Sequence, residues 1–397
     1  MNKIKKEGTM IKIDRAMDII KGQKVNWPTE KVELMNALGR IMVTELSSPY
    51  DSPPFDKAAM DGFAINSRDE SEKFFIAEII GAGDTPQKTV KQGTCSKIMT
   101  GAMMPSGADK IIRVEFADEI DGYAVPHTPE PVKNVIKQAE NLSAGDKVIS
   151  PGKLEAKDIG IIASMGFPEV EVAKRPVVGV LTTGSELKNP GEELGSGQIY
   201  NSNGFQMSAH IASTGCIPKY YGIIVDDRVS LSEAVAKAFS ECDIVLLSGG
   251  VSKGDYDYVP EVLEDNGMAT LFHRVAIKPG RPLLFGRKDD VFVFGLPGNP
   301  VSTFVTFEVF VKTLIYHLAG LNYEPETYKG KLSRGIKRRD TERTEFHPVI
   351  LRDGNVEPIK YMGSSHLNAM SEANGMIVIP NGIGEFKEGE TVSVRSI

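Results

Sequence analysis

The chain contains few cysteines, and they show no pattern. Only three occur in 397 residues, Cys95, Cys216 and Cys242, and they are scattered. An odd number of cysteines without metal-ligand spacing argues against a disulfide framework and against a structural zinc site. A reducing cytoplasm is the compartment that this usage favours.

Several common functional signatures are also missing. The sequence has no Walker A pattern and no GxGxxG following an apolar strand, which argues against a P-loop kinase and a nicotinamide dehydrogenase. Its six histidines show no HExxH spacing, so none is assigned to a metal.

The chain carries no excess of positive charge. It has 46 Lys and Arg against 53 Asp and Glu, a net charge of −7, which argues against general nucleic-acid binding. No apolar run approaches the roughly 18 residues of a membrane span, and the basic start is not followed by a signal-type apolar core. Residues 1–9 precede the first amphipathic stretch, which opens at Met10, and are interpreted as an extension. A mass of 43.2 kDa predicts two to four domains.

Residues 176–320 alternate short apolar runs with amphipathic segments. This β-α-β-α rhythm predicts a three-layer α/β/α domain with a parallel or mostly parallel sheet. Ligands of such a domain bind at the carboxyl ends of the strands. Four unusual polar turns follow the strands, and we expect them to share one rim: residues 182–187, 226–227, 248–257 and 295–300.

The last of these turns, Gly295-Leu296-Pro297-Gly298-Asn299-Pro300, joins an apolar run to a long apolar-periodic segment. It predicts a strand, a tight turn and a helix start. Asn299 suits the N-cap and Pro300 the first helical position, so free N–H groups would face an anionic ligand.

Residues 248–257 place two glycines before hydroxyls, a lysine and two carboxylates. Gly249 and Gly250 would let the backbone approach a ligand, while Asp255 and Asp257 could hold a hard cation such as Mg²⁺. A polar turn with a capping aspartate is the alternative. Glu186, after a Thr-Thr-Gly-Ser turn, could likewise cap the backbone, join a metal site or act on water.

Lys278-Pro279-Gly280-Arg281-Pro282 sets two cations three residues apart on a chain stiffened by prolines. Fixed cations at that spacing suit a small oxyanion, and a solvated basic turn is the alternative. Residues 52–64 present Asp56 and Asp61 in a stiff stretch of mostly small residues, where an Asp-Gly turn with a conformational role is also possible.

The C-terminal residues 328–397 consist of short β-rich runs separated by Asp-Gly, Asn-Gly and Glu-Gly pairs. They predict a small antiparallel β-barrel or sandwich. The first 175 residues mix a helix with several strands and Gly/Pro-rich turns.

Taken together, these stretches resemble the molybdopterin molybdenumtransferase family, which includes the bacterial MoeA proteins and the E domain of gephyrin. PPFDKAAMDGFA, a TGA segment, TTGSEL, NSNG, SGGVSKGDYD, IKPGRP and GLPGNPVS occur in family order and spacing along nearly the whole chain.

The resemblance implies a multidomain fold of α/β and β type. The N-terminal region, residues 10–175, would form two interlaced mixed subdomains, about 10–48 with 142–175, and 49–141. A molybdopterin-binding α/β domain would span residues 176–321 and a C-terminal β-barrel residues 328–397. It also implies a cytoplasmic homodimer, and the upstream molybdopterin adenylyltransferase is a candidate partner.

The implied reaction combines adenylylated molybdopterin with molybdate, using Mg²⁺, and releases AMP. By family correspondence the catalytic positions are Asp61, Thr100, Glu186, Asp226 and Asp257. Mg²⁺ would be held by Asp257 with Asp255 or Glu186. Substrate binding is assigned to Gly249, Gly250, Ser252, Lys278, Arg281, Pro297, Asn299, Pro300 and Ser364.

Three departures from the family pattern stand out. Asn141 replaces a common Asp, Arg281 a frequent Lys, and Pro348 follows Phe346-His347 where many members carry an arginine. Arg343 could take over the anion contact of that arginine, or the oxyanion pocket is altered. The alternatives to the transferase are a gephyrin-type scaffold, a tungstate-specific paralogue, and a nucleotide pyrophosphatase that reuses the α/β domain. Residues 52–64 argue against the last.

Overall fold

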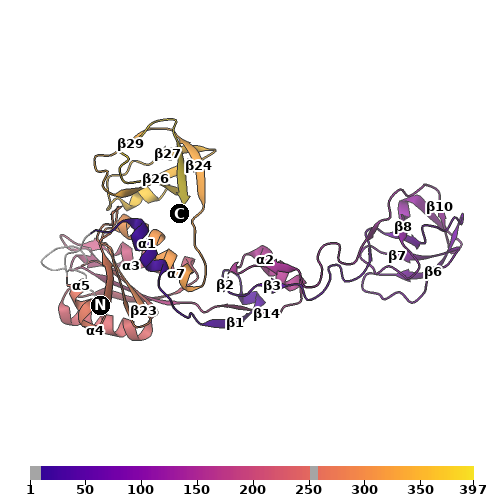
Figure 1. The fold of residues 1–397 in the computed structure, drawn as a ribbon, viewed down its shortest axis with the longest axis horizontal. Helices are drawn as coiled ribbons and strands as arrows, with labels where there is room; N and C mark the ends of the chain where they lie inside the picture. The colour runs from indigo at the N-terminus through magenta and orange to yellow at the C-terminus, as the bar shows by residue number, and fades with distance from the viewer. Residues whose placement is uncertain (1–9, 251–257) are drawn as a thin grey trace. The chain divides into compact units, whose positions relative to one another are not determined.

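A computed structural model describes residues 10–250 and 258–397. The described chain forms two compact units (Figure 1). The first unit contains residues 10–30, 39–43 and 172–397, and the second contains residues 31–38 and 44–171.

The first unit is built on a six-stranded sheet that confirms the expected mostly parallel topology. Its order is β18-β15-β19-β23-β22-β20, and the first four strands run parallel while β22 is antiparallel to both neighbours. The strands are β15 (Val177–Thr183), β18 (Ile217–Ile224), β19 (Ile244–Ser248), β20 (Ala269–His273), β22 (Leu284–Lys288) and β23 (Val291–Leu296).

Helices cover both faces of this sheet. Along β19, Ile244 and Leu246 pack in one core, while Val245 and Leu247 pack in the other. This alternation is that of a strand buried on both faces. The first core includes side chains from α1 (Ile13–Lys21), α3 (Ser202–Ser213), α6 (Pro300–Thr306) and α7 (Lys312–Leu318); the second includes those of α4 (Arg228–Glu241) and α5 (Val259–Asp265). Figure 1 shows α4 and α5 on the side of the sheet away from α1 and α7.

Helix α1 lies within residues 10–48, which the family resemblance places in the N-terminal region, and it packs against the α/β core. Ala16 and Ile20 are fully buried in the α/β core, and Ile11 forms a parallel bridge with Val275. The amphipathic pattern of the helix correctly indicates one buried face, but a local pattern cannot say which partner covers it.

The long core helix spans Pro300–Leu318 and includes one π-helical turn, Phe307–Val311, between α6 and α7. By length and composition alone it could cross a membrane, but 83% of its most apolar window is buried inside the protein. Phe307, Phe310 and Leu314 are fully buried in the core. Core packing therefore accounts for its apolar composition.

The C-terminal residues form a closed β-barrel, as expected, but it is not wholly antiparallel, because the strands Thr327–Leu332 and Asn355–Pro358 pair in parallel. Five strands pair in a ring, β26-β27-β24-β30-β28 and back to β26. They are β24 (Thr327–Leu332), β26 (Thr344–Arg352), β27 (Asn355–Pro358), β28 (Gly375–Ile379) and β30 (Thr391–Ser396). The short strand β21 (Ile277–Lys278) of the α/β domain pairs in parallel with β26. The barrel thus joins the α/β domain directly beside the Lys278 turn.

Minor elements complete the first unit. Strands β25 (Ile336–Lys337) and β29 (Glu385–Phe386) pair with each other, as do β16 (Leu187–Lys188) and β17 (Ile199–Tyr200). A 3-10 helix spans Leu367–Met370. Strand β14 (Glu169–Ala173) pairs with β2 (Ile41–Met42) through Val172 and Met42.

The second unit contains a six-stranded sheet of order β8-β5-β7-β6-β10-β9. Its strands are β5 (Gly62–Ile65), β6 (Phe74–Ile80), β7 (Thr94–Ile98), β8 (Lys110–Arg113), β9 (Ala117–Ile120) and β10 (Tyr123–Pro126). Apolar side chains form a core on each face of it, one around Phe63 and Phe74 and the other around Ile80 and Ile98.

Residues distant in sequence also meet in the second unit. Strand β3 (Leu46–Ser47) pairs with β12 (Lys147–Ile149), and β4 (Lys57–Ala58) with β11 (Val135–Ile136). Helix α2 (Ala156–Ser164) begins with a capping box between Glu155 and Asp158 and contacts the 3-10 helix Leu34–Asn36. The remaining short elements are β1 (Thr29–Glu33), β13 (Gly152–Lys153) and the 3-10 helix Val114–Phe116.

Candidate functional site

A pocket of about 670 Å³ lies in the first unit at the carboxyl ends of β15, β19 and β23. This is the edge where ligands of an open α/β sheet bind, and the volume suits a small-molecule site. Its lining brings together the expected Glu186, Asp226, Gly249, Gly250, Pro297, Asn299 and Pro300. It also contains Thr183, Gly184, Leu187, Ile199, Tyr200, Asn201, Ser202, Asn203, Pro282, Gly298 and Ser365.

Two carboxylates face this pocket from neighbouring turns. At the end of β15, Thr183 donates its hydroxyl to Oδ1 of Asp226 at 3.2 Å. The exposed Glu186 folds back over Gly184, where a Cβ would lie 2.7 Å from Oε2 of Glu186. The glycine in the Thr-Thr-Gly-Ser turn therefore leaves room for the carboxylate.

Gly249 and Gly250 form the wall after β19, and both need to be glycine. Their φ angles are +100° and +63°, in the left-handed region that other residues avoid. A Cβ at Gly249 would lie 2.2 Å from the Thr183 carbonyl oxygen, and one at Gly250 would lie 2.7 Å from Cγ2 of Val259. The bare backbone of this turn can thus pack against the neighbouring strand.

Asn203 is a pocket residue that sequence reasoning did not assign to the site. Its Nδ2 donates to Oγ of Ser248 at 2.8 Å and to the Gly298 carbonyl at 2.7 Å, so it ties two of the polar turns together. Its Oδ1 is buried and has no hydrogen-bond partner. The NSNG motif that contains it was noticed, but only Asn201 behaves as the local pattern indicates, by capping α3 through the Gly204 N–H.

The turn before α6 confirms the expected strand, turn and helix start, with Asn299 at the N-cap and Pro300 at the first helical position. The expectation of free N–H groups facing an anion is wrong at one donor. The Val301 N–H bonds to the Ser364 carbonyl at 3.0 Å, whereas the bond of the Thr303 N–H to the Asn299 carbonyl at 3.0 Å is the ordinary first bond within the helix. Satisfied donors offer little to an anion.

The barrel supplies the segment that covers this helix start. The Asn299 side chain does not cap its helix but donates through Nδ2 to Oγ of Ser364 at 2.9 Å. Its neighbour Ser365, not Ser364, is among the pocket-lining residues. Ser365 therefore forms part of the pocket wall, and Ser364 joins this segment to the start of α6 through Asn299 and Val301.

Lys278 and Arg281, the expected oxyanion ligands, are not among the described residues that line the pocket, although the adjacent Pro282 is. Arg281 is exposed. Nζ of Lys278 lies 3.0 Å from Oε2 of the buried Glu345. Sequence reasoning did not single out Glu345.

Asp61 and Thr100 belong to the second unit and contact each other. Oδ1 of Asp61 accepts the Thr100 N–H at 2.6 Å and the Thr100 hydroxyl at 2.7 Å. These hydrogen bonds, the one from the side chain first, lower the pKa of the exposed Asp61 carboxyl.

Ser252, Asp255 and Asp257 lie outside the described residues. Within residues 10–250 and 258–397, no group of three or more His, Cys, Asp or Glu side chains could hold a metal ion. Of the expected metal ligands, only Glu186 is therefore placed, on the same pocket as Asp226.

The departures from the family pattern have ordinary surroundings. Asn141 is exposed, and its backbone N–H bonds to the Ser52 carbonyl at 3.0 Å. Pro348 is buried in β26. Arg343 is engaged with Asp340, with Nε 2.9 Å from Oδ2, so it is not a free anion ligand.

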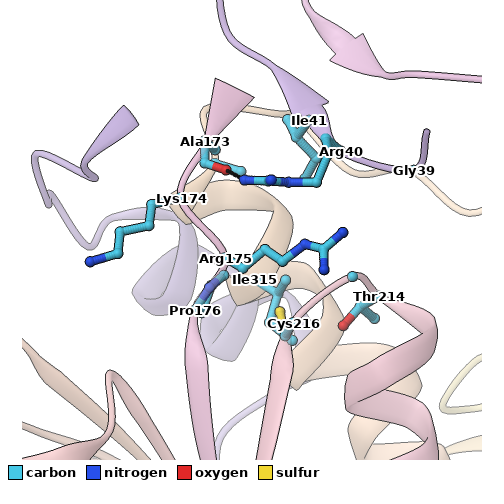
Figure 2. Close-up of a pocket in the computed structure, with 12 residues that line it drawn as sticks. Gly39, Arg40, Ile41, Ala173, Lys174, Arg175, Pro176, Thr214, Cys216 and Ile315 are labelled. Atoms are coloured by element: carbon cyan, nitrogen blue, oxygen red, sulfur yellow. Dashed lines mark hydrogen bonds between the residues drawn. The ribbon is translucent and has the colours of Figure 1, made fainter. Parts of the chain in front are cut away.

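A second pocket of the first unit, drawn in Figure 2, is too small for an organic ligand. It has about 20 Å³, close to the space of one water molecule. The Arg40 side chain runs along it and donates to the Ala173 carbonyl at 3.0 Å. Burial raises the pKa of the Cys216 thiol in its wall to about 11, so the thiol is neutral at physiological pH. The larger pocket is thus the better candidate site.

Comparison with protein families matches three models along the chain. They are described as the MoeA N-terminal region (domain I and II) over residues 11–166, a probable molybdopterin binding domain over residues 179–317, and the MoeA C-terminal region (domain IV) over residues 329–397.

Similar proteins and structures agree with these matches. Proteins named molybdopterin molybdenumtransferase from Staphylococcus epidermidis and Staphylococcus aureus are each 33% identical, covering 97% of this chain and 95% of their own. A structure of molybdopterin biosynthesis MoeA protein from Pyrococcus horikoshii superposes with a TM-score of 0.85 at 29% identity, covering 98% of this chain and 99% of that one.

Proposed function

Since the chain belongs to the molybdopterin molybdenumtransferase family, an enzyme family of molybdenum cofactor biosynthesis, we propose that it inserts molybdate into adenylylated molybdopterin with release of AMP. The observation that carries the proposal is the large pocket at the carboxyl ends of the strands. The backbone of Gly249 and Gly250 and the carboxylates of Glu186 and Asp226 line it together.

The site must accept a ligand that is already negatively charged. Carboxylates alone would repel a pyrophosphate and an oxyanion, so a cation is needed between the carboxylates and these anionic ligands. Glu186 and Asp226 offer the hard oxygen donors that Mg²⁺ prefers, and this ion typically completes its shell with water and substrate phosphates. We assign Glu186 and Asp226 to hold Mg²⁺ together with Asp257, and the bound ion would neutralise charge on the departing AMP.

The residues of the chain have separable tasks in this proposal. Gly249 and Gly250 let the pterin phosphate approach the backbone, and Asn203 fixes the turns that shape the pocket. Lys278 and Arg281 attract molybdate, and Ser364 is assigned to substrate binding through the family resemblance. The family resemblance adds three further parts to the proposal. Asp61 and Thr100 take catalytic roles, the protein forms a homodimer, and a molybdopterin adenylyltransferase supplies its substrate.

Release of AMP tests the proposal. The purified protein, adenylylated molybdopterin, molybdate and Mg²⁺ are expected to release AMP, and omission of molybdate should abolish the release. Asp226→Asn should reduce turnover by roughly 100-fold or more if the carboxylate holds the Mg²⁺ that neutralises developing negative charge. Asp265→Asn provides the control, because Asp265 pairs with Arg228 on the surface and should leave turnover unchanged.

AMP at the level of a protein-free control would reject the proposed reaction. Competition between molybdate and tungstate in the same assay identifies the preferred oxyanion. A wild-type rate with Asp226→Asn would remove this carboxylate from the mechanism.

A further inference from the structure

Glu345 is a buried carboxylate placed directly beside Lys278. Strand β21 pairs in parallel with β26, and the register sets Lys278 opposite Glu345. Residues opposite each other in neighbouring strands project to the same face. Nζ of Lys278 is 3.0 Å from Oε2 of Glu345, and the two side chains are 36% and 7% exposed.

Two further cationic or polar groups surround this carboxylate. Arg338 comes within 3.9 Å, but its guanidinium also donates to the backbone carbonyls of Arg343, Pro380 and Ile383. Nδ1 of His347 lies 3.6 Å from Oε1 of Glu345, too far for a hydrogen bond, and has no other partner. Lys278 is therefore the side chain bonded directly to Glu345.

The protonation state of Glu345 suits this role. Burial alone would raise the pKa of its carboxyl, but the neighbouring His347 and Lys278 outweigh burial, so the pKa is lower than usual. The carboxylate is charged at neutral pH and attracts the ammonium group of Lys278.

The backbone of the Lys278 turn is also packed in place, in addition to the ion pair made by the Lys278 ammonium group. Gly280 has a φ of +113°, and a Cβ there would lie 2.5 Å from Cγ2 of Thr306, so the turn packs against α6 without a gap. A lysine side chain otherwise samples many rotamers. Fixing both its backbone and its ammonium group confines Nζ to one position.

We propose that Glu345 is a positioning residue for oxyanion binding, because it accepts one N–H of the Lys278 ammonium and leaves the other two to face molybdate. An ammonium group has three donors, and a single buried acceptor sets the direction of the remaining two. The inference rests on the proposed function, which assigns Lys278 to molybdate. A purely structural ion pair between β21 and the barrel is the alternative.

Glu345→Gln separates the two explanations. Removing a negative charge beside Lys278 would by itself strengthen anion binding, so weaker binding of molybdate is the signature of lost positioning. We expect the KM for molybdate in AMP release to rise about tenfold, as for groups that orient a ligating side chain. The kcat and the KM for adenylylated molybdopterin should stay within about twofold of the wild type, because the variant alters only the group that orients Lys278 toward molybdate.

Glu308→Gln is a closely matched control. Glu308 is 5% exposed, lies 3.0 Å from Lys312 and has Nδ1 of His210 at 3.7 Å, so its surroundings copy those of Glu345. No residue of this control group lines the large pocket. Glu308→Gln should lower the thermal unfolding temperature but leave the KM for molybdate unchanged.

A double-mutant cycle tests whether Glu345 acts through Lys278. Lys278→Met should raise the KM for molybdate, and adding Glu345→Gln to it should cause no further rise. Glu345→Asp, with a shorter carboxylate, should give an intermediate KM and serves if Glu345→Gln does not fold.

Three results would overturn the inference. They are an unchanged or lower KM for molybdate in the folded variants, an equal effect in Glu308→Gln, and multiplicative effects in the double mutant. If the wild-type protein releases no AMP, the proposed function fails as well, whereas an active wild type with an unchanged KM in the variants rejects only the role of Glu345.

Discussion

At the scale of single residues, the absence of a side chain can matter as much as its presence. Gly249 touches the Thr183 carbonyl so closely that no Cβ fits, and its φ of +100° would strain any other residue. Thr183 in turn donates to Asp226. A displacement of Thr183 caused by a side chain at position 249 would therefore also move the Asp226 carboxylate, which it contacts.

Gly249→Ala should consequently affect both stability and activity. We expect a loss of more than about 2 kcal/mol in unfolding free energy, from the left-handed backbone and the clash together. AMP release should fall along with it. Gly320→Ala is the matched control, because Gly320 has a φ of +81° but no atom within 4 Å of its Cβ position. It should lose only about 1–2 kcal/mol, for the backbone alone, and keep full activity.

Denaturant titration and the AMP assay distinguish these variants. Equal stability losses in Gly249→Ala and Gly320→Ala would show that the backbone near Thr183 yields without cost. Full activity of Gly249→Ala would show that the turn does not transmit strain to Asp226.

Asn203 and Glu345 show which site residues a sequence alone cannot reveal. Asn203 stands in a motif whose local duty, the cap of α3, belongs to Asn201. Its own partners, Ser248 and Gly298, are 45 and 95 residues away along the chain. Glu345 likewise meets Lys278 only because β21 joins the barrel sheet. Contacts of this range depend on the assembled fold.

At the scale of elements, the periodicity of residues 176–320 correctly predicted the sheet, its covering helices and the polar rim. These features follow from local alternation and from turn chemistry, which the sequence displays directly. The prediction failed at the start of α6, where Ser364 of the C-terminal domain occupies the Val301 N–H, a donor that was expected to be free. A single buried stripe, such as that of α1, does not identify the partner that covers it.

The contact between the C-terminal domain and α6 predicts that the side chains of Asn299 and Ser364 contribute to stability as a coupled pair. Asn299→Ala and Ser364→Ala each remove the same hydrogen bond, of 2.9 Å between side chains. Each should lower the unfolding free energy by about 0.5–1.5 kcal/mol. The backbone bond from Val301 to the Ser364 carbonyl persists in both variants, so neither should detach the segment.

The double variant should then be no less stable than the worse single variant, with a coupling energy of about 1 kcal/mol. Chemical denaturation of the four proteins in the cycle measures this value. Strict additivity would mean that the two side chains contribute independently, contrary to the observed bond.

At the scale of the whole molecule, the chain is divided into two compact units with separate apolar cores. Units with their own cores can unfold in separate steps, so a single transition need not describe the protein. We expect calorimetry to resolve more than one transition. Variants confined to one unit should then identify which transition belongs to it.

The second unit should be sensitive to acid through Glu130. A bond from Arg113, opposed by burial, lowers the pKa of the Glu130 carboxyl from 4.5 to about 2. Because the folded state favours the charged form, the stabilisation is complete above about pH 4.5 and is lost as the pH falls toward 2. The transition of the second unit should therefore shift to lower temperature over this range.

Glu130→Gln should remove part of that acid dependence. At pH 7 we expect it to cost about 1–3 kcal/mol, because Nε of Arg113 donates to this nearly inaccessible carboxylate at 2.8 Å. Its penalty should shrink between pH 4.5 and 2, where the wild type loses the same charge. Glu119→Gln is the control within the same unit: its pair with Lys97 is 46% and 28% exposed, so it should cost less than about 1 kcal/mol. A pH-independent penalty for Glu130→Gln, measured by calorimetry at several pH values, would show that the charge of Glu130 contributes nothing to the folded unit beyond its packing.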